Sequence, residues 1–95
     1  MANRRNLKKD IQFLTSQLIV DAVEIAEQAN PEVQDEIIKI ISNAAVLHND
    51  LIVRVNHIDG KDNPKMVKKF FKTIVDDLLK GMDAMYSKLA VYVKN

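Results

Sequence analysis

The segment NPEVQDEIIKIISNAAVLHNDLIVRVNH, residues 30–57, decides the fold of this chain. Asn30 is a preferred N-cap residue, and Pro31 suits the first helical turn, where its missing N–H leaves no hydrogen bond unmade. The apolar residues that follow keep the 3.6-residue period of a helix as far as residue 58. The buried face is expected to consist of Val33, Ile37, Ile40, Ile41, Ala44, Leu47, Leu51, Val55 and Ile58. Because this face is broad enough to contact two neighbours, the segment predicts the central helix of a bundle.

A second amphipathic pattern precedes this segment, over residues 7–29. Its apolar positions alternate between spacings of four and three residues, at Leu7, Ile11, Leu14, Leu18, Ala22, Ile25 and Ala29, with Ile19, Val23 and Ala26 widening the same face. Asn6 is the expected N-cap, and residues 1–6 are expected to be flexible. The residue before a proline resists helical geometry, so this helix is expected to end at Asn30. A connection this short predicts an antiparallel helical hairpin.

The clearest loop is Asp59-Gly60-Lys61-Asp62-Asn63-Pro64. Gly60 suits a left-handed helix C-cap, and Asn63-Pro64 repeats the helix start seen at Asn30-Pro31. A third helix is therefore predicted over about residues 64–93. Its apolar side is expected to hold Met66, Val67, Phe70, Phe71, Ile74, Val75, Leu78, Leu79, Met82, Met85, Tyr86, Leu89 and Val93. Gly81 falls inside that side, where glycine costs about 1 kcal/mol against alanine, so a close helix crossing is expected there.

These patterns predict an all-α fold, an up-down-up antiparallel three-helix bundle with helices over about residues 7–29, 31–58 and 64–93. Ninety-five residues make one domain, so residues 1–95 are expected to form a single helical unit. The main structural alternative is a helical unit that completes a larger bundle only as a dimer.

Composition excludes several classes of function. The chain has 14 basic and 13 acidic residues and a net charge of +1, which argues against a dedicated nucleic-acid binder. No run of residues has the length and hydropathy of a membrane span or a signal peptide, so we expect a cytoplasmic protein with no membrane partner. With no cysteine and only two glycines, thiolate metal sites and glycine-rich phosphate loops are ruled out. We expect no enzymatic activity, no cofactor and no metal.

One polar group in the central helix merits attention: His48, Asp50, Arg54 and His57. Asp50 and Arg54 are spaced for an i,i+4 ion pair, and His57 lies near the negative end of the helix. His48 falls on the core side, where a buried histidine satisfied by another helix is the ordinary interpretation. The functional alternative is a small-ligand or anion site in which Arg54 and His57 combine with a loop lysine such as Lys61.

Four apolar residues fall outside the expected core. Phe13 and Val20 lie on the far face of the first helix, and Val46 and Val53 lie on the far face of the second. We therefore predict a non-enzymatic helical interaction module, either a homodimer or a binder of a partner protein. The alternative is a binder of nucleic acid or another acidic partner, through the basic N-terminus and the Lys61–Lys72 cluster.

Two segments, Arg4-Arg5-Asn6-Leu7-Lys8-Lys9-Asp10-Ile11 and Leu47-His48-Asn49-Asp50-Leu51-Ile52-Val53-Arg54-Val55-Asn56-His57, carry a resemblance. They resemble a family of small, uncharacterised all-helical proteins from Bacteroides-like bacteria. The resemblance implies a helical fold and a bacterial cytoplasmic origin, and it implies no particular activity.

Overall fold

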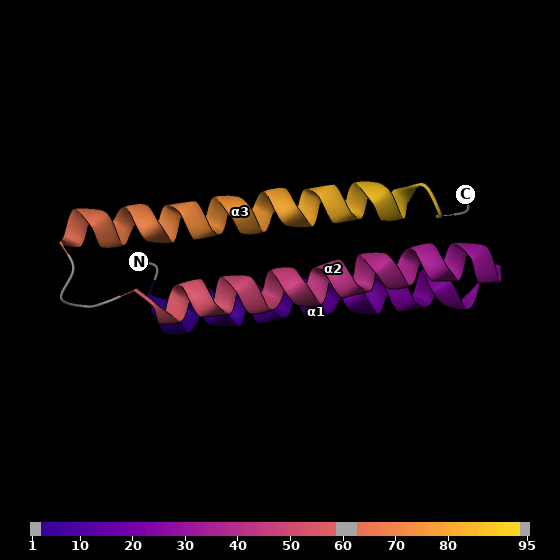
Figure 1. Cartoon of the computed structure of the whole chain (residues 1–95), viewed down its shortest axis with the longest axis horizontal. Coiled ribbons are helices and arrows are strands. Elements are labelled where there is room, and N and C mark those ends of the chain that lie inside the picture. Colours follow the sequence, from indigo (N-terminus) through magenta and orange to yellow (C-terminus); the bar gives the residue numbers. More distant parts are fainter. Residues whose placement is uncertain (1–2, 59–62, 94–95) are drawn as a thin grey trace.

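A computed structural model describes residues 3–58 and 63–93 of the chain, which form three helices (Figure 1). Helix α1 spans Arg4–Glu27, α2 spans Pro31–Asn56 and α3 spans Pro64–Ala90. In Figure 1, α1 and α2 form a long antiparallel hairpin and α3 runs back along it, so the molecule is a rod of 51 × 20 × 16 Å. The predicted all-α antiparallel three-helix bundle is confirmed.

Asparagine caps define the start of each helix. The Asn30 side chain accepts a hydrogen bond from the Val33 N–H at 3.0 Å, and the Asn63 side chain accepts one from the Lys65 N–H at 2.8 Å. Each thereby satisfies one of the backbone donors that a helix leaves unpaired in its first turn. Both Asn-Pro helix starts predicted from the sequence are confirmed.

The start of α1 corrects a prediction. Asn3, not Asn6, is the N-cap: its side-chain oxygen accepts from the Asn6 N–H at 2.8 Å, so Asn6 lies inside the helix. Residues 4–6, expected to be flexible, are therefore helical. The extra turn brings Arg4 to the far end of α2, where its Nη1 donates to the Ile58 carbonyl at 3.0 Å. That tertiary contact favours the earlier of two possible asparagine caps.

All three helices end two or three residues before the predicted boundary. The backbone N–H groups of Gln28, Ile58 and Val93 each bond to the carbonyl three residues earlier, at 3.2, 3.2 and 3.3 Å. Such bonds tighten the chain beyond the last α-helical turn while its apolar residues still reach the core. Apolar periodicity therefore overestimates helix length. The predicted Gly60 cap lies outside the described residues.

The core runs along the bundle axis between the helices. Its buried apolar residues are Leu7, Ile11, Leu18, Ala22, Ile37, Ile40, Ala44, Leu51, Val55, Ile58, Ile74, Leu78, Met82, Met85 and Leu89. Thr15 is also buried, and its hydroxyl donates to the Ile11 carbonyl at 2.7 Å, a hydrogen bond within its own helix. Sequence patterning missed this residue because a threonine does not register as apolar.

The predicted close approach at Gly81 is confirmed. A Cβ atom built on Gly81 would lie 2.6 Å from Cδ2 of Leu47, so the Leu47 side chain on α2 lies directly against the α3 backbone. Elsewhere α3 is held less closely: α1 and α2 contact each other most extensively, and α1 and α3 least.

Several residues assigned to the core are exposed instead. Val23 is 41% exposed on α1, and Met66, Phe70 and Leu79 are 51%, 39% and 55% exposed on α3. Each lies at the margin of an apolar face wider than two neighbouring helices can cover. A three-helix bundle thus leaves apolar side chains in solvent that a bundle with an additional helix would bury.

Candidate functional site

Arg54 has a closer carboxylate partner than the one predicted. Its Nη1 lies 2.8 Å from Oδ2 of Asp77 on α3 and 3.9 Å from Oδ2 of Asp50 on its own helix. The predicted Asp50–Arg54 pair therefore exists but is the weaker contact. The Arg54–Asp77 pair joins α2 to α3, and helical spacing within α2 carries no signal for it.

The two histidines of the predicted polar group lie in different surroundings. His48 is half-buried, and its Nδ1 lies 3.0 Å from Oδ1 of the adjacent Asn49. The prediction of a buried His48 satisfied by another helix was therefore wrong, because the residue lies at the edge of the buried face of α2. His57 is exposed at the C-cap of α2.

Arg54 and His57 come together at a cavity between α2 and α3, whereas His48 and Asp50 do not line it. The cavity has a volume of about 580 Å³ and is lined by Arg54, His57, Ile58, Met66, Lys69, Phe70, Thr73 and Ile74. Its wall is apolar, its charged or titratable lining residues are all basic, and its size falls within the range of small-ligand sites. The sequence missed Lys69 and Phe70 because they follow from how α3 is rotated against α2. Lys61, the lysine expected there, lies outside the described residues.

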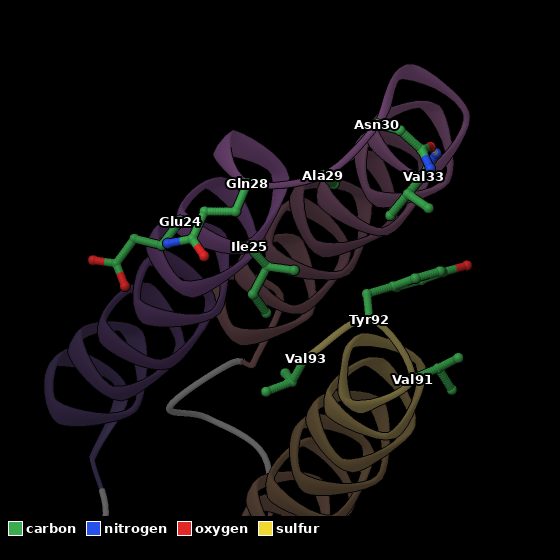
Figure 2. A pocket seen from close by; sticks show the side chains of 9 residues that line it. All are labelled: Glu24, Ile25, Gln28, Ala29, Asn30, Val33, Val91, Tyr92 and Val93. Carbon is green, nitrogen blue, oxygen red and sulfur yellow. Dashed lines mark hydrogen bonds between the residues drawn. The ribbon is translucent and has the colours of Figure 1, made fainter. Parts of the chain in front are cut away.

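A second cavity, of about 450 Å³, lies at the opposite end of the bundle (Figure 2). It is enclosed by the α1–α2 corner and the residues that follow α3: Glu24, Ile25, Gln28, Ala29, Asn30, Val33, Val91, Tyr92 and Val93. In Figure 2, the Val33 and Ile25 side chains point from the hairpin corner towards the end of the chain that carries Tyr92 and Val93. Neither a nucleophile with a positioned base nor a cluster of metal ligands occurs among the described residues here.

A tyrosine joins α3 to α1 next to that cavity. The Tyr86 hydroxyl donates to Oδ2 of Asp21 at 2.9 Å, and Gln17 donates to the other oxygen of the same carboxylate at 3.1 Å. Burial raises the pKa of the Tyr86 hydroxyl above its ordinary value, and the hydrogen bond and the negative charge of Asp21 raise it further. Tyr86 is therefore a neutral donor in a structural contact.

The four candidate interface residues are all exposed: Phe13 68%, Val20 50%, Val46 67% and Val53 52%. Each pair lies on the side of its helix that faces away from the core. Because the outward faces of neighbouring helices in a bundle diverge, the pairs form two separate patches. The patch on α1 is the more apolar, since Val23 extends it.

The α1 patch belongs to a regular stripe, here called the outer stripe. It consists of Lys9, Phe13, Ser16, Val20, Val23 and Glu27, all exposed and spaced alternately four and three residues apart. This spacing places side chains along one line of a helix, as in a coiled-coil seam. The sequence shows the same spacing, but it predicts Val23 on the core face, whereas the structure exposes this residue in the outer stripe.

Charged residues avoid the middle of the α1–α2 hairpin. Residues 11–20 and 40–49 contain no Asp, Glu, Lys or Arg. The hydrogen bonds from Gln34 to the Ala26 carbonyl and from Arg4 to the Ile58 carbonyl fix the hairpin register and place these segments side by side. The hairpin thus carries an uncharged belt, and depletion of charge is typical of the centre of a protein interface.

Basic residues gather at one end of the bundle, because α1 and α3 both begin there (Figure 1). The described members are Arg4, Arg5, Lys8, Lys9, Lys65, Lys68, Lys69 and Lys72. Both basic clusters predicted from the sequence therefore lie at the same end of the bundle. Binding of nucleic acid or another acidic partner at this end stays a prediction.

Fold and site together define an antiparallel three-helix bundle with an exposed apolar stripe and a basic cavity. None of the family models, curated proteins or solved structures compared with the chain matches it, so the resemblance to uncharacterised bacterial proteins stays a prediction. Within residues 3–58 and 63–93, none of the helices has the length and hydropathy that crossing a membrane requires.

Proposed function

We propose that this chain is a non-enzymatic helical interaction module that self-associates. The observation that supports this proposal is the set of exposed apolar residues on the outward faces of the hairpin: Phe13, Val20 and Val23 on α1 and Val46 and Val53 on α2. Single exposed apolar residues are common on monomeric proteins. Here, however, two pairs recur at seven-residue spacing on adjacent helices, Phe13/Val20 and Val46/Val53, and three of these four residues lie within the uncharged belt.

The gain from covering these residues is large relative to the stability of a chain this short. Burying a valine or phenylalanine side chain fully is worth about 1.5–3 kcal/mol, and a domain of this size is stable by only about 5–14 kcal/mol. Covering even part of Phe13 and Val20 would therefore add appreciably to the stability of the fold. Self-association supplies such a cover without requiring any second gene product.

The test is the solution mass, measured by size-exclusion chromatography with light scattering across a range of protein concentrations at low and high salt. We expect a dimer that persists at high salt, because apolar contacts are not screened by ions. The double variant Val20→Asp/Val53→Asp should be monomeric. The matched control, Val91→Asp, changes a valine that is 78% exposed outside both patches and should remain dimeric. A wild-type monomer at all concentrations would contradict the proposal.

A second candidate function is the binding of a small anionic ligand with an apolar body in the α2–α3 cavity. Arg54, His57 and Lys69 contribute its polar atoms, while Met66 and Phe70 lie beside it with half or more than a third of their surface exposed. Arg4 bonds to the Ile58 carbonyl and thereby offsets the negative end of α2, which would otherwise repel an anion. The cavity therefore combines an apolar wall with basic lining residues, of which Arg54 is already paired with Asp77 and Lys69 forms no ion pair among the described residues.

Decanoate is a suitable probe for this second candidate. Backbone NMR shifts should move at Met66, Phe70 and Thr73 on addition of decanoate, and much less with decylammonium, which has the same tail and the opposite charge. Lys69→Gln should weaken decanoate binding and leave the fold unchanged, because Lys69 is exposed. Equal responses to the two probes, or shifts centred elsewhere, would contradict an anion site.

A further inference from the structure

We infer that the partner of the outer stripe is a second copy of this chain whose α1 lies antiparallel to α1 of the first, pairing Lys9 with Glu27 of the second copy. This inference rests on the proposed self-association and specifies its geometry. Three features of α1 support it: the order of residues along the stripe, the distribution of charge along the helix, and the polarity of the alternative stripe on α2.

The outer stripe is close to self-complementary about residue 18. A twofold axis at that level places Lys9 opposite Glu27, Phe13 opposite Val23, and Ser16 opposite Val20. Every pair is therefore either oppositely charged, or apolar, or a small residue facing a β-branched one. A twofold dimer requires a surface that is complementary to itself, and this stripe satisfies that requirement without any change of conformation.

Charge along α1 is distributed in the order that an isolated helix disfavours. Arg4, Arg5, Lys8 and Lys9 lie near its N-terminus, where Asp10 is the one acidic residue, and Asp21, Glu24 and Glu27 lie near its C-terminus. The helix dipole favours acidic residues at the N-terminus and basic residues at the C-terminus, so both ends are unfavourable in the monomer. An antiparallel copy brings the acidic end of one α1 beside the basic end of the other and offsets both.

Helix α2 reinforces this imbalance at the acidic end of α1. Because α2 is antiparallel to α1, its acidic first turns, with Glu32, Asp35 and Glu36, lie beside the acidic end of α1. In the part of the chain that the structure describes, no side chain of α1 forms an ion pair. Like charges thus gather at the acidic end of the α1–α2 hairpin. Two parallel copies would place like charges together, whereas two antiparallel copies place opposite charges together.

The corresponding line on α2 is a poorer seam. Its exposed positions at the same spacing are Lys39, Ser42, Val46, Asn49, Val53 and Asn56, of which only the two valines are apolar. It has a basic residue at one end and no acidic residue at the other, so an antiparallel copy gains no charge pair. This comparison favours α1 as the contact helix.

Charge-reversal variants test the pairing. Lys9→Glu and Glu27→Lys each place two like-charged pairs across the twofold interface, and each should raise the dimer dissociation constant by about tenfold or more. Neither change should unfold α1, because each one improves the match between the side-chain charge and the helix dipole. The double variant Lys9→Glu/Glu27→Lys should regain wild-type dimer affinity. An equimolar mixture of the two single variants should form heterodimers in preference to either homodimer.

Two controls separate the possible outcomes. Lys80→Glu makes the same charge change at an exposed position of α3 and should leave dimer affinity unchanged. A zero-length carbodiimide should link Lys9 to Glu27 only between copies, since about 27 Å of helix separates the two residues within one chain.

A wild-type monomer would overturn both the proposed function and this pairing. A dimer that ignores the charge reversals, or that Val53→Asp disrupts while Val20→Asp does not, would overturn the pairing and leave self-association intact.

Discussion

The Leu47 side chain on α2 lies directly against Gly81 on α3. An alanine Cβ at position 81 would lie 2.6 Å from Cδ2 and 3.4 Å from Cδ1 of Leu47, so the leucine fills the space that any side chain would need. A glycine within a helix is less favourable than alanine by about 1 kcal/mol. Here the absence of a side chain on the glycine makes room for the close approach. The two positions are therefore energetically coupled.

Gly81→Ala should be mildly destabilising, by up to about 2 kcal/mol, because crowding costs about 1–3 kcal/mol and the gain in helix propensity returns about 1 kcal/mol. In a Leu47→Ala background the same change should instead stabilise the protein by about 1 kcal/mol, since the clash is gone. Chemical denaturation of the four proteins of this cycle measures the coupling. If Gly81→Ala has the same effect in both backgrounds, the side chain of Leu47 does not limit the site.

The ion pair between Arg54 and Asp77 should contribute more than the one between Arg54 and Asp50. A double-mutant cycle of Arg54→Ala and Asp77→Ala should give a coupling of about 0.2–1 kcal/mol, as expected for partly exposed pairs, and it should decrease at high salt. The corresponding cycle with Asp50→Ala should give less, because its oxygen is 3.9 Å from the arginine rather than 2.8 Å. Equal couplings would mean that Arg54 samples both carboxylates equally in solution.

Tyr86 should titrate above the ordinary tyrosine pKa of 10.0, because burial, the hydrogen bond to Asp21 and the Asp21 charge all disfavour the phenolate. A group whose pKa is raised on folding contributes stability below its unfolded pKa and loses it as the pH rises through its folded pKa. The Asp21 contact should therefore weaken above about pH 10. Ultraviolet titration in a Tyr92→Phe background isolates Tyr86, the one remaining tyrosine. Asp21→Asn should lower the pKa of Tyr86, and an unchanged pKa would rule out a contribution from the Asp21 charge.

Asn3 should matter more to stability than Asn6. Asn3→Ala removes the N-cap of α1 and should cost about 1 kcal/mol, whereas Asn6→Ala replaces an exposed residue inside the helix and should change stability by no more than about 0.5 kcal/mol. Thermal unfolding at one fixed protein concentration compares the two variants. A larger loss of stability for Asn6→Ala than for Asn3→Ala would indicate that Asn6 is the N-cap of α1, as expected from the sequence alone.

Helix number, order and approximate extent followed from the sequence because they depend on local chemistry. Asn30 and Asn63, each followed by proline, are local signals for a helix start, and an apolar repeat of 3.6 residues can be recognised without knowledge of the partner helix. The close helix approach at Gly81 could also be predicted from the sequence, because glycine is unfavourable inside a helix unless a neighbouring helix packs closely against it. Boundaries were less accurate, because apolar residues continue to pack after the last helical turn.

The candidate site was predicted in part, for a definite physical reason. Arg54 and His57 were identified from their spacing on one helix, but Asp77 and Lys69 reach them from α3, and their proximity depends on how two helices are rotated and shifted against each other. The prediction that His48 is buried was wrong, because a residue at the margin of an apolar face can be buried or exposed. Which of the two occurs depends on how far the neighbouring helix covers that margin.

By itself, the sequence determined that this chain forms three helices joined by short connections, and it marked Phe13, Val20, Val46 and Val53 as residues that such a core does not need. Tertiary structure alone decided that Val23 joins Phe13 and Val20 in an exposed stripe, that the acidic ends of α1 and α2 lie side by side, and that a cavity with basic lining residues opens between α2 and α3. The reason is that helix formation and capping are governed by residues within a few positions of one another. Burial and charge proximity are set by contacts between helices, which local spacing does not specify.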